Sequence, residues 1–411
     1  MLSILSNINP AIPLTLFLLA LLGLRFRVNP RTSLWVNTSP EKLFALVDVH
    51  DGKRENWGRT VTHIEYVDHG KGIYRKTYET SLTTGTVQTS QALFSIAKCE
   101  APNLLDIKRE GLEGLSLNNE LLSQTYSITP ENGGSRLQVA YAWGPRPLLA
   151  QLLARADLWG GAFRLKGLAE TGVPSEWQYQ LISLGIALFT GLLTFAGFTT
   201  MMNLTTAALI IGALFIHEFG HLLAYRLMGQ PWGKMVFLPF LGAIAMPRLP
   251  YATQGQAVFA ALMGPGFSIL PAIVCALPSF LWDEIRPLTL VCGTIMVLLN
   301  LFNLLPVEPL DGGVALRSVL AKLFGKNARF GLMAVGTVFV TVGILMSQLI
   351  LAIFGGISIL ANLRVRSIDA GLTPLSSLQV TISFFSYVAL FTAYVTLLRY
   401  FYSLSLLFTS R

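Results

Sequence analysis

Apolar residues follow one pattern in the second half of the chain. From about Trp177 onward, long apolar runs with few charges are separated by short polar segments. A run of roughly 20 apolar residues is long enough to cross a bilayer as a helix. The apolar segment 330–363 is too long for one simple span and fits either one tilted helix or a hairpin. We predict membrane spans at about 180–201, 204–228, 256–281, 287–310, 331–354 and 379–400.

Residues 32–172 follow a different pattern, in which apolar and polar positions alternate. The segments TVTHIEYV, GIYRKTYETSL, TVQTSQALFSIAKC, LLSQTYSIT and SRLQVAYAW have the period of two that is typical of half-buried strands. The segment TSPEKLFALV predicts a short helix, with Ser39 as its N-cap and Pro40 in its first turn. The segment PRPLLAQLLARADLWGGAFRLKGLAE predicts a long amphipathic helix that closes an α+β domain.

An apolar run near the start of the chain, NINPAIPLTLFLLALLGLRFR, has basic residues only at and after its end, at Arg25, Arg27 and Arg31. It lacks the preceding basic residue and the small-residue cleavage site that a signal peptide normally has. Basic residues favour the cytoplasmic side of a span. We therefore predict a transmembrane anchor at 1–31, a cytoplasmic domain at 32–172 and a multi-span membrane domain at 173–411.

The composition agrees with a polytopic membrane protein. The 411 residues are 53% hydrophobic and only 13% charged, whereas a soluble protein is roughly a quarter charged. The net charge of +8 comes from Lys and Arg that cluster beside apolar segments, where they set topology and contact anionic lipid. We expect the lipid bilayer as a partner and no nucleic acid.

One apolar segment, ALFIHEFGHLLAY, contains three groups that bind protons or metals. His217 and His221 are four residues apart, so both imidazoles lie on one face of a helix. Glu218 is the only formal charge between Glu176 and Arg226, and a charge at a span centre costs about 2.5–3.5 kcal/mol on insertion scales. The pattern H-E-x-x-H predicts two zinc ligands with a general base beside them.

Zinc in a catalytic site needs a third protein ligand and an open position for water. The segment LLNLFNLLPVEPLDGG offers Asp311, at the predicted end of a span, and Glu308, three residues earlier. Pro306 and Pro309 interrupt the helix there. Spacing alone leaves both carboxylates open as the third ligand.

Two motifs in this half of the chain resemble those of the site-two protease family of intramembrane zinc metalloproteases. H-E-x-x-H is matched by His217, Glu218 and His221, and N-x-x-P-x-x-x-x-D-G by the segment that begins at Asn303 and contains Asp311. The resemblance covers about 178–325. It implies one zinc ion per chain held by both histidines and Asp311, with Glu218 as the catalytic base. Asn303 would help to hold the substrate carbonyl or the oxyanion.

The family resemblance implies further properties. Substrates would be transmembrane proteins cleaved in or near their membrane segments, and the location would be a bacterial-type cell membrane. The segment MVFLPFLGAIAMP, which contains Gly242, resembles the family's membrane-embedded hairpin. The segment ALMGPGFS resembles its Gly-Pro element on the third helix, but we assign no role to it.

The domain at 32–172 resembles the START-like (SRPBCC) helix-grip fold, in which a sheet wraps the last helix around an apolar cavity. The resemblance rests on the order of the expected elements and implies a lipid or another hydrophobic ligand that gates the protease. His50, His63 and His69 in this domain form no recognised ligand pattern, and we expect them to be solvated or hydrogen-bonded.

The sequence also allows two alternative functions. One is a membrane-anchored lipid or ligand sensor, in which the START-like domain is the working part. The other is a non-proteolytic metal-binding membrane protein such as a chaperone. The intact Glu218 favours the protease.

Overall fold

The computed structural model describes residues 25–27, 29–56, 60–82, 87–110, 121–239, 242–277, 284–347, 349–363 and 372–409. It contains two compact units that divide between Ser183 and Leu184. The predicted anchor at 1–31 lies mostly outside the described residues. Of its described part, Arg25–Phe26 forms strand β1 and pairs with β10 (Arg146–Pro147).

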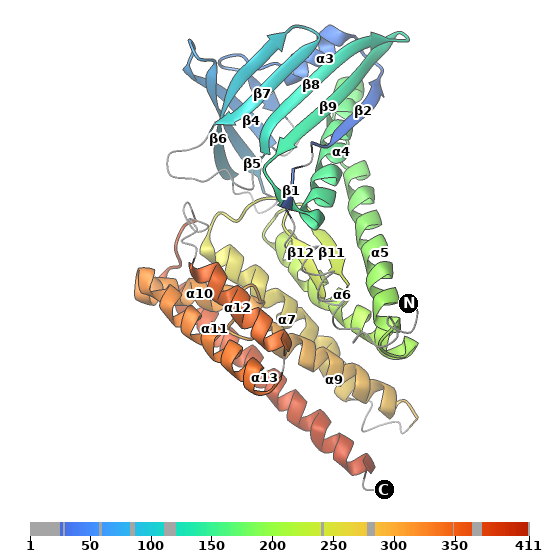
Figure 1. Cartoon of the computed structure of the whole chain (residues 1–411), viewed down its shortest axis with the longest axis vertical. Helices are drawn as coiled ribbons and strands as arrows, with labels where there is room; N and C mark the ends of the chain where they lie inside the picture. Colours follow the sequence, from blue (N-terminus) through green and yellow to red (C-terminus); the bar gives the residue numbers. More distant parts are fainter. Residues whose placement is uncertain are drawn as a thin grey trace, which may run out of the picture. The chain divides into compact units, whose positions relative to one another are not determined.

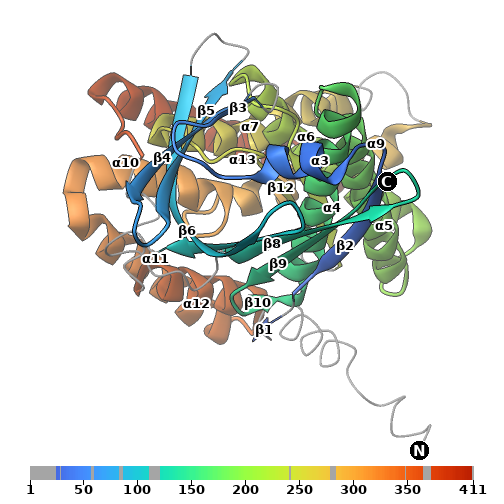
Figure 2. The ribbon, with the colours of Figure 1, turned by 90° about the horizontal axis from the view of Figure 1, so that it is seen from above.

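The first unit contains an eight-stranded antiparallel sheet in the order β2-β9-β8-β7-β6-β5-β4-β3 (Figures 1 and 2). Seven strands follow one another along the chain, and β2 joins the far edge by pairing with β9. The strands are β2 (Arg31–Val36), β3 (Arg54–Asn56), β4 (Thr60–Asp68), β5 (Ile73–Ser81), β6 (Val87–Glu100), β7 (Leu104–Glu110), β8 (Leu121–Glu131) and β9 (Gly134–Trp143).

Two helices complete this unit, α3 (Pro40–Val47) and the long α4 (Leu148–Thr171). Ser39 caps α3 as predicted, because its side chain accepts from the backbone N–H of Lys42 at 3.4 Å. Leu158 and Leu165 of α4 pack into the same buried cluster as side chains from the sheet. This sheet wrapped on a final helix is the helix-grip arrangement.

The predicted strands at β4, β5, β6, β8 and β9 are confirmed, whereas β2, β3 and β7 were not among the predictions. Strand β2 depends on pairing with a partner about a hundred residues away, as in Trp35 opposite Arg136. Local alternation does not reveal such a pairing. Strand β7 is short and charged at its end, LLDIKRE.

Six of the described helices are long and apolar enough to cross a membrane. They correspond to the six predicted spans, and the chain is a multi-pass membrane protein. They are α5 (Trp177–Thr199), α6 (Leu204–Leu227), α7 (Gln254–Ala276), α9 (Arg286–Asn303), α11 (Ala328–Leu345) and α13 (Ser377–Thr409).

The predicted fourth span extends too far. Helix α9 ends at Asn303, and a separate helix, α10, runs from Asp311 to Phe324. Pro306 and Pro309 lie in the turn between them, where a missing N–H prevents a continuous helix. The segment 330–363 forms a hairpin, because α11 is followed by α12 (Leu349–Leu363) and the two helices pack closely at Gly336 and Gly355.

The core of the membrane unit brings together helices that are distant in sequence. Apolar side chains of α6, α7, α9, α10 and α13 form one buried cluster that includes Met296, Val297 and Tyr394. A short hairpin of β11 (Lys234–Leu238) and β12 (Gly242–Met246) follows α6. It confirms the expected hairpin at MVFLPFLGAIAMP, and Gly242 has a φ of 114° that favours glycine.

Candidate metal centre

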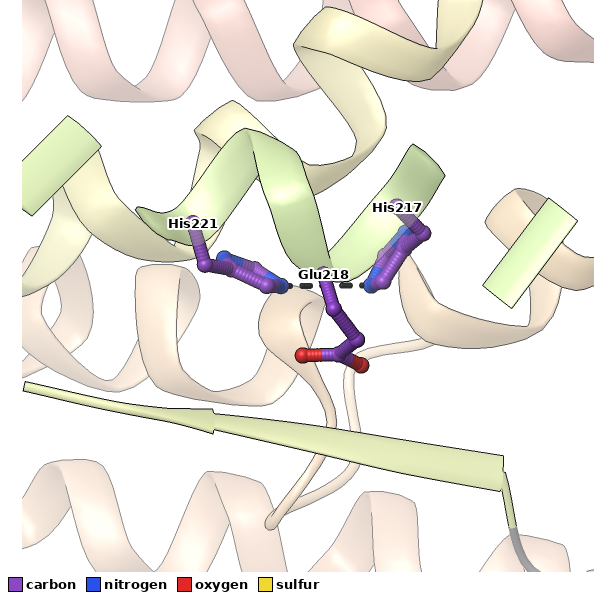
Figure 3. A group of neighbouring side chains, drawn as sticks. All are labelled: His217, Glu218 and His221. Carbon is purple, nitrogen blue, oxygen red and sulfur yellow. Dashed lines mark hydrogen bonds between the residues drawn. The ribbon is translucent and has the colours of Figure 1, made fainter. Parts of the chain in front are cut away.

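His217 and His221 face one another on α6, as their spacing predicts. Their Nε2 atoms are 3.2 Å apart, and the two residues are only 2% and 7% exposed. Figure 3 shows both rings directed towards a shared point beside the helix. The local helical repeat of four residues accounts for this pairing.

Each histidine has a partner for its other ring nitrogen. Nδ1 of His217 is 2.9 Å from Oδ1 of Asn300 on α9, and Nδ1 of His221 is 2.8 Å from the carbonyl oxygen of Ala260 on α7. The Asn300 amide nitrogen donates to the Met296 carbonyl at 2.8 Å, so its oxygen faces the ring. Both partners only accept hydrogen bonds, so both Nδ1 atoms carry the hydrogen and both Nε2 atoms present lone pairs.

Asp311 completes the group from the turn that follows α9. Its Oδ2 is 3.1 Å from Nε2 of His217 and 3.5 Å from Nε2 of His221, and it has no hydrogen-bond partner within the described part of the chain. Three lone-pair atoms thus face one another without a hydrogen between them. This donor set fits a divalent cation, and two imidazoles with one carboxylate are ligands that zinc accepts.

The turn at Asp311 is closely packed. A Cβ on Gly312 would overlap the carbonyl of Leu304, and one on Gly313 would overlap the backbone of Val307. The hydroxyl of Tyr387 on α13 donates to the same Leu304 carbonyl at 2.7 Å. The two glycines therefore let the start of α10 approach the end of α9, which brings Asp311 to the histidines.

Glu218 lies beside this group and is 5% exposed. Its carboxylate is within 4.8 Å of both imidazoles, but Figure 3 shows it displaced from the line that joins them. It accepts a hydrogen bond from the backbone N–H of Ala245 on β12. Two carboxylates are therefore near the histidines, and Asp311 makes the shorter approach.

Glu308, the rival carboxylate, is engaged elsewhere. Its Oε1 lies 3.0 Å from a guanidinium nitrogen of Arg317 on α10, and Asn362 on α12 donates to Oε2 at 3.5 Å. It is 6% exposed. This buried ion pair ties the turn to two helices, and Glu308 is held by Arg317 and Asn362 whereas Asp311 faces the histidines.

Asn303 does not contact the histidines in the structure. Its amide nitrogen donates to the Leu299 carbonyl of its own helix at 3.0 Å. The expected role in holding a substrate carbonyl therefore stays a prediction. Asn300, which does reach His217, lies one turn earlier, and its only sequence signal is an amide within the apolar run VLLNLFN.

Gly264 of the segment ALMGPGFS also belongs to the site. A Cβ there would overlap Nε2 of His221 and press on the His217 ring. The α13 side chain Tyr394 donates to the neighbouring Pro265 carbonyl at 2.7 Å. Helix α7 thus approaches the two histidines so closely that only glycine fits, a role that the sequence did not reveal.

The three other histidines lie in the first unit, as isolated residues with acidic neighbours. His50 is 3.3 Å from Asp48, His63 is 3.3 Å from Glu79, and His69 is 3.5 Å from Asp51. Across the residues that the structure describes, the one group of His, Cys, Asp or Glu suited to a metal contains His217, Glu218 and His221.

No family model matches the chain. A zinc metalloprotease of Methanocaldococcus jannaschii is 30% identical over 151 residues, which are 35% of this chain and 44% of that protein. The chain thus spans less than half the length of this curated relative.

Two solved structures resemble separate parts of the chain. A site-2 protease from Methanocaldococcus jannaschii has 24% identity and a TM-score of 0.31 over 43% of this chain and 87% of that chain. The Aha1 dimer from Colwellia psychrerythraea has 11% identity and a TM-score of 0.24 over 35% of this chain and 98% of that chain. The membrane unit of this chain thus resembles zinc metalloproteases of the site-two protease family in its paired motifs and in its 30% identity to the named relative.

Proposed function

We propose that the chain is a zinc-dependent endopeptidase that hydrolyses peptide bonds in or near transmembrane segments. The observation that carries this proposal is the convergence of His217, His221 and Asp311, with Glu218 beside them. One zinc ion per chain would be held by the two Nε2 atoms and the Asp311 carboxylate. A metal in such a site supplies Lewis acidity, which acidifies water and polarises a carbonyl.

Glu218 would act as general base. Its carboxylate is held by the Ala245 N–H on one side and remains close to the metal ligands. It would take the proton from the attacking water and pass it to the leaving amide nitrogen, so that one carboxylate serves both halves of the reaction. General catalysis of this kind contributes about 10²–10⁴-fold to rate.

The hairpin of β11 and β12 would position the substrate. A transmembrane helix hides its amides in its own hydrogen bonds, so it must unwind before cleavage. An unwound segment is extended, and it can add to the edge of a two-stranded sheet by backbone pairing. Because Ala245 of β12 also contacts Glu218, a segment on this hairpin would lie near the base.

The test uses Glu218→Gln, which keeps the shape of the side chain and removes the base. We expect the purified variant to retain zinc near one per chain and to lose cleavage of a labelled transmembrane peptide by at least about 100-fold. The double variant His217→Ala with His221→Ala should lose both zinc and activity. Full zinc content in the double variant would show that the ligands are wrong, and full activity of Glu218→Gln would remove it as the base.

The proposal includes control of the protease by the first unit, which we place in the cytoplasm. Helix α4 packs on the start of α5, the helix that continues into the membrane unit. Arg164 of α4 pairs with Glu176 at 3.3 Å, and the hydroxyl of Tyr179 donates to Asp157 at 3.4 Å. A displacement of α4 would therefore pull directly on α5, provided that a ligand favours one arrangement by differential affinity.

The sensor and chaperone alternatives share one measurable property that separates them from the protease. Both allow ligand or metal binding without peptide hydrolysis that depends on Glu218. The peptide assay of wild type beside Glu218→Gln therefore separates them from the protease.

A further inference from the structure

Helix α13 lies beyond both sequence motifs, yet one of its faces packs on the helices of the metal site. Tyr387, Tyr394 and Phe401 recur every seven residues, which is about two helical turns, so they share this face. Tyr394 and Phe401 are 0% and 1% exposed. A Cβ on Gly293 of α9 would overlap the Phe401 ring, so α13 and α9 approach one another closely.

Tyr387 on this face donates to the backbone at the end of α9. Its hydroxyl is 2.7 Å from the carbonyl oxygen of Leu304, the C-cap residue of α9. Carbonyls at the end of a helix have no partner within the helix, so the hydroxyl takes the place of a backbone donor. In an apolar interior, removal of such a donor leaves the carbonyl without a hydrogen bond, which is costly.

The Leu304 carbonyl also faces the turn that carries Asp311. A Cβ on Gly312 would overlap this carbonyl, so the start of α10 lies directly against it. Tyr387 therefore holds the end of α9 at the place where α10 must approach for Oδ2 of Asp311 to lie 3.1 Å from Nε2 of His217. This contact acts on the metal site through the position of Asp311.

Tyr394 makes the equivalent contact to α7. Its hydroxyl is 2.7 Å from the carbonyl oxygen of Pro265, the residue after Gly264. A Cβ on Gly264 would overlap Nε2 of His221, so α7 has almost no room to shift towards the histidines. The hydrogen bond to Pro265 holds α7 at this distance from His221.

The start of α13 is fixed to the start of α7. Thr253 and Thr373 form a parallel β-bridge. The N–H of Gln254 donates to the Thr373 carbonyl at 3.0 Å, and the Thr373 N–H donates to the Ala252 carbonyl at 3.1 Å. These bonds set the position of α13 along α7, so each tyrosine meets one particular carbonyl.

We propose that Tyr387 and Tyr394 are positioning residues of the metal site, so that α13 is part of this site although it carries neither motif. Tyr387 fixes the end of α9 and thereby Asp311, and Tyr394 fixes α7 beside His221. The inference rests on the proposed zinc site, because it concerns the geometry in which the ligands hold the metal. It does not rest on peptide hydrolysis, in which neither tyrosine has a step.

The test measures metal affinity and ligand geometry of the full-length protein in detergent. Tyr387→Phe removes only the hydroxyl, and we expect zinc affinity to fall by about three- to tenfold, the effect of one lost hydrogen bond. The visible absorption of Co²⁺ bound in place of zinc reports the ligand geometry, and we expect its bands to shift. Tyr394→Phe should change both measurements in the same way.

Tyr400→Phe is the matched control. Tyr400 also donates from α13 to a carbonyl of α7, that of Ala276, at 3.3 Å. Ala276 ends α7 and lies roughly 18 Å along the helix from Gly264. Tyr400→Phe should therefore lower the unfolding temperature but keep the zinc affinity and the Co²⁺ spectrum of the wild type. An equal loss of zinc affinity in all three variants would show that α13 only stabilises the fold.

A double variant separates positioning from general stabilisation. Gly264→Ala presses α7 on the His221 ring, and Tyr394→Phe frees α7 to move back. We expect the double variant to bind zinc at least about threefold more tightly than the two single effects predict, as for residues that are coupled. Additive effects would overturn the role of Tyr394. If Tyr387→Phe does not fold, this double variant decides the proposal.

The same measurements distinguish this inference from the proposed function. A wild type that binds neither zinc nor Co²⁺ would overturn the metal site and the inference with it. A folded double variant Tyr387→Phe with Tyr394→Phe that keeps normal zinc affinity and the normal Co²⁺ spectrum would overturn the role of α13 alone. Zinc-loaded wild type without cleavage that depends on Glu218 would overturn only the protease.

Discussion

Oδ1 of Asn300 lies 2.9 Å from Nδ1 of His217, although the two residues are 83 positions apart in sequence. This contact fixes which nitrogen of His217 carries the hydrogen and leaves Nε2 available to a metal. Acceptors of this kind around metal-binding histidines orient the ring and raise its basicity. The contact also links α9, which precedes the turn at Asp311, to α6.

The first prediction follows from this contact. We expect Asn300→Ala to lower zinc affinity by about 10–100-fold, because His217 loses its orienting acceptor. Asn303→Ala should keep zinc at the wild-type affinity, because that amide donates only to its own helix. Competition with a zinc-sensitive chelator measures both. Equal zinc affinity of Asn300→Ala and wild type would contradict the assignment.

The activity of Asn303→Ala separates two roles. A loss of cleavage with full zinc content agrees with a contact to the substrate carbonyl, as the family motif implies. Unchanged cleavage would remove Asn303 from the site.

The second prediction distinguishes the two carboxylates. Asp311→Asn should lose zinc, because a neutral amide replaces the carboxylate beside both Nε2 atoms. Glu308→Gln should keep zinc but unfold more easily, because it weakens the buried pair with Arg317. Metal analysis and thermal unfolding in detergent measure the two effects. Zinc loss in Glu308→Gln with Asp311→Asn still loaded would reverse the assignment.

The third prediction uses two glycines of the same helix. Gly264→Ala places a methyl group on the His221 ring, so we expect zinc loss and a destabilisation of about 1–3 kcal/mol from overpacking. Gly266→Ala meets no atom within 4 Å and should be close to neutral in both respects. If both variants bind zinc and cleave normally, the approach of α7 to the histidines does not require glycine at position 264.

The fourth prediction concerns control of the protease by the first unit. Glu176→Gln breaks the pair between α4 and the start of α5, so we expect a change of at least twofold in peptide cleavage with unchanged zinc content. Glu65→Gln is the control, because Glu65 forms an exposed pair with Arg75 within the sheet. Identical rates for wild type and Glu176→Gln would argue against coupling through this contact.

Local sequence patterns were sufficient to predict the membrane spans, the main strands and part of the candidate site. The six spans follow from apolar runs and the main strands from alternation, because each repeat is a property of neighbouring residues. The pairing of His217 with His221 also needs only one helical turn. Glu218 was recognisable because a lone carboxylate in an apolar run is costly.

Where two candidate residues lie close together in sequence, only the tertiary structure shows which of them reaches the histidines. Asp311 and Glu308 are three positions apart in one turn, and the packing of α10 on α9 directs one to the histidines and the other to Arg317. Asn300 and Asn303 are one helical turn apart, and the rotation of α9 selects Asn300 for His217.

A cavity between the sheet and α4 of the first unit depended on tertiary structure for a related reason. Its lining is assembled from several strands and α4, so Lys76 and Arg164 border one space only when the sheet curves around the helix. Sequence periodicity assigns a residue to a face of its own element. The packing of distant elements determines which faces meet. Burying apolar surface lowers the free energy of the fold whatever the separation of the contacting residues along the chain.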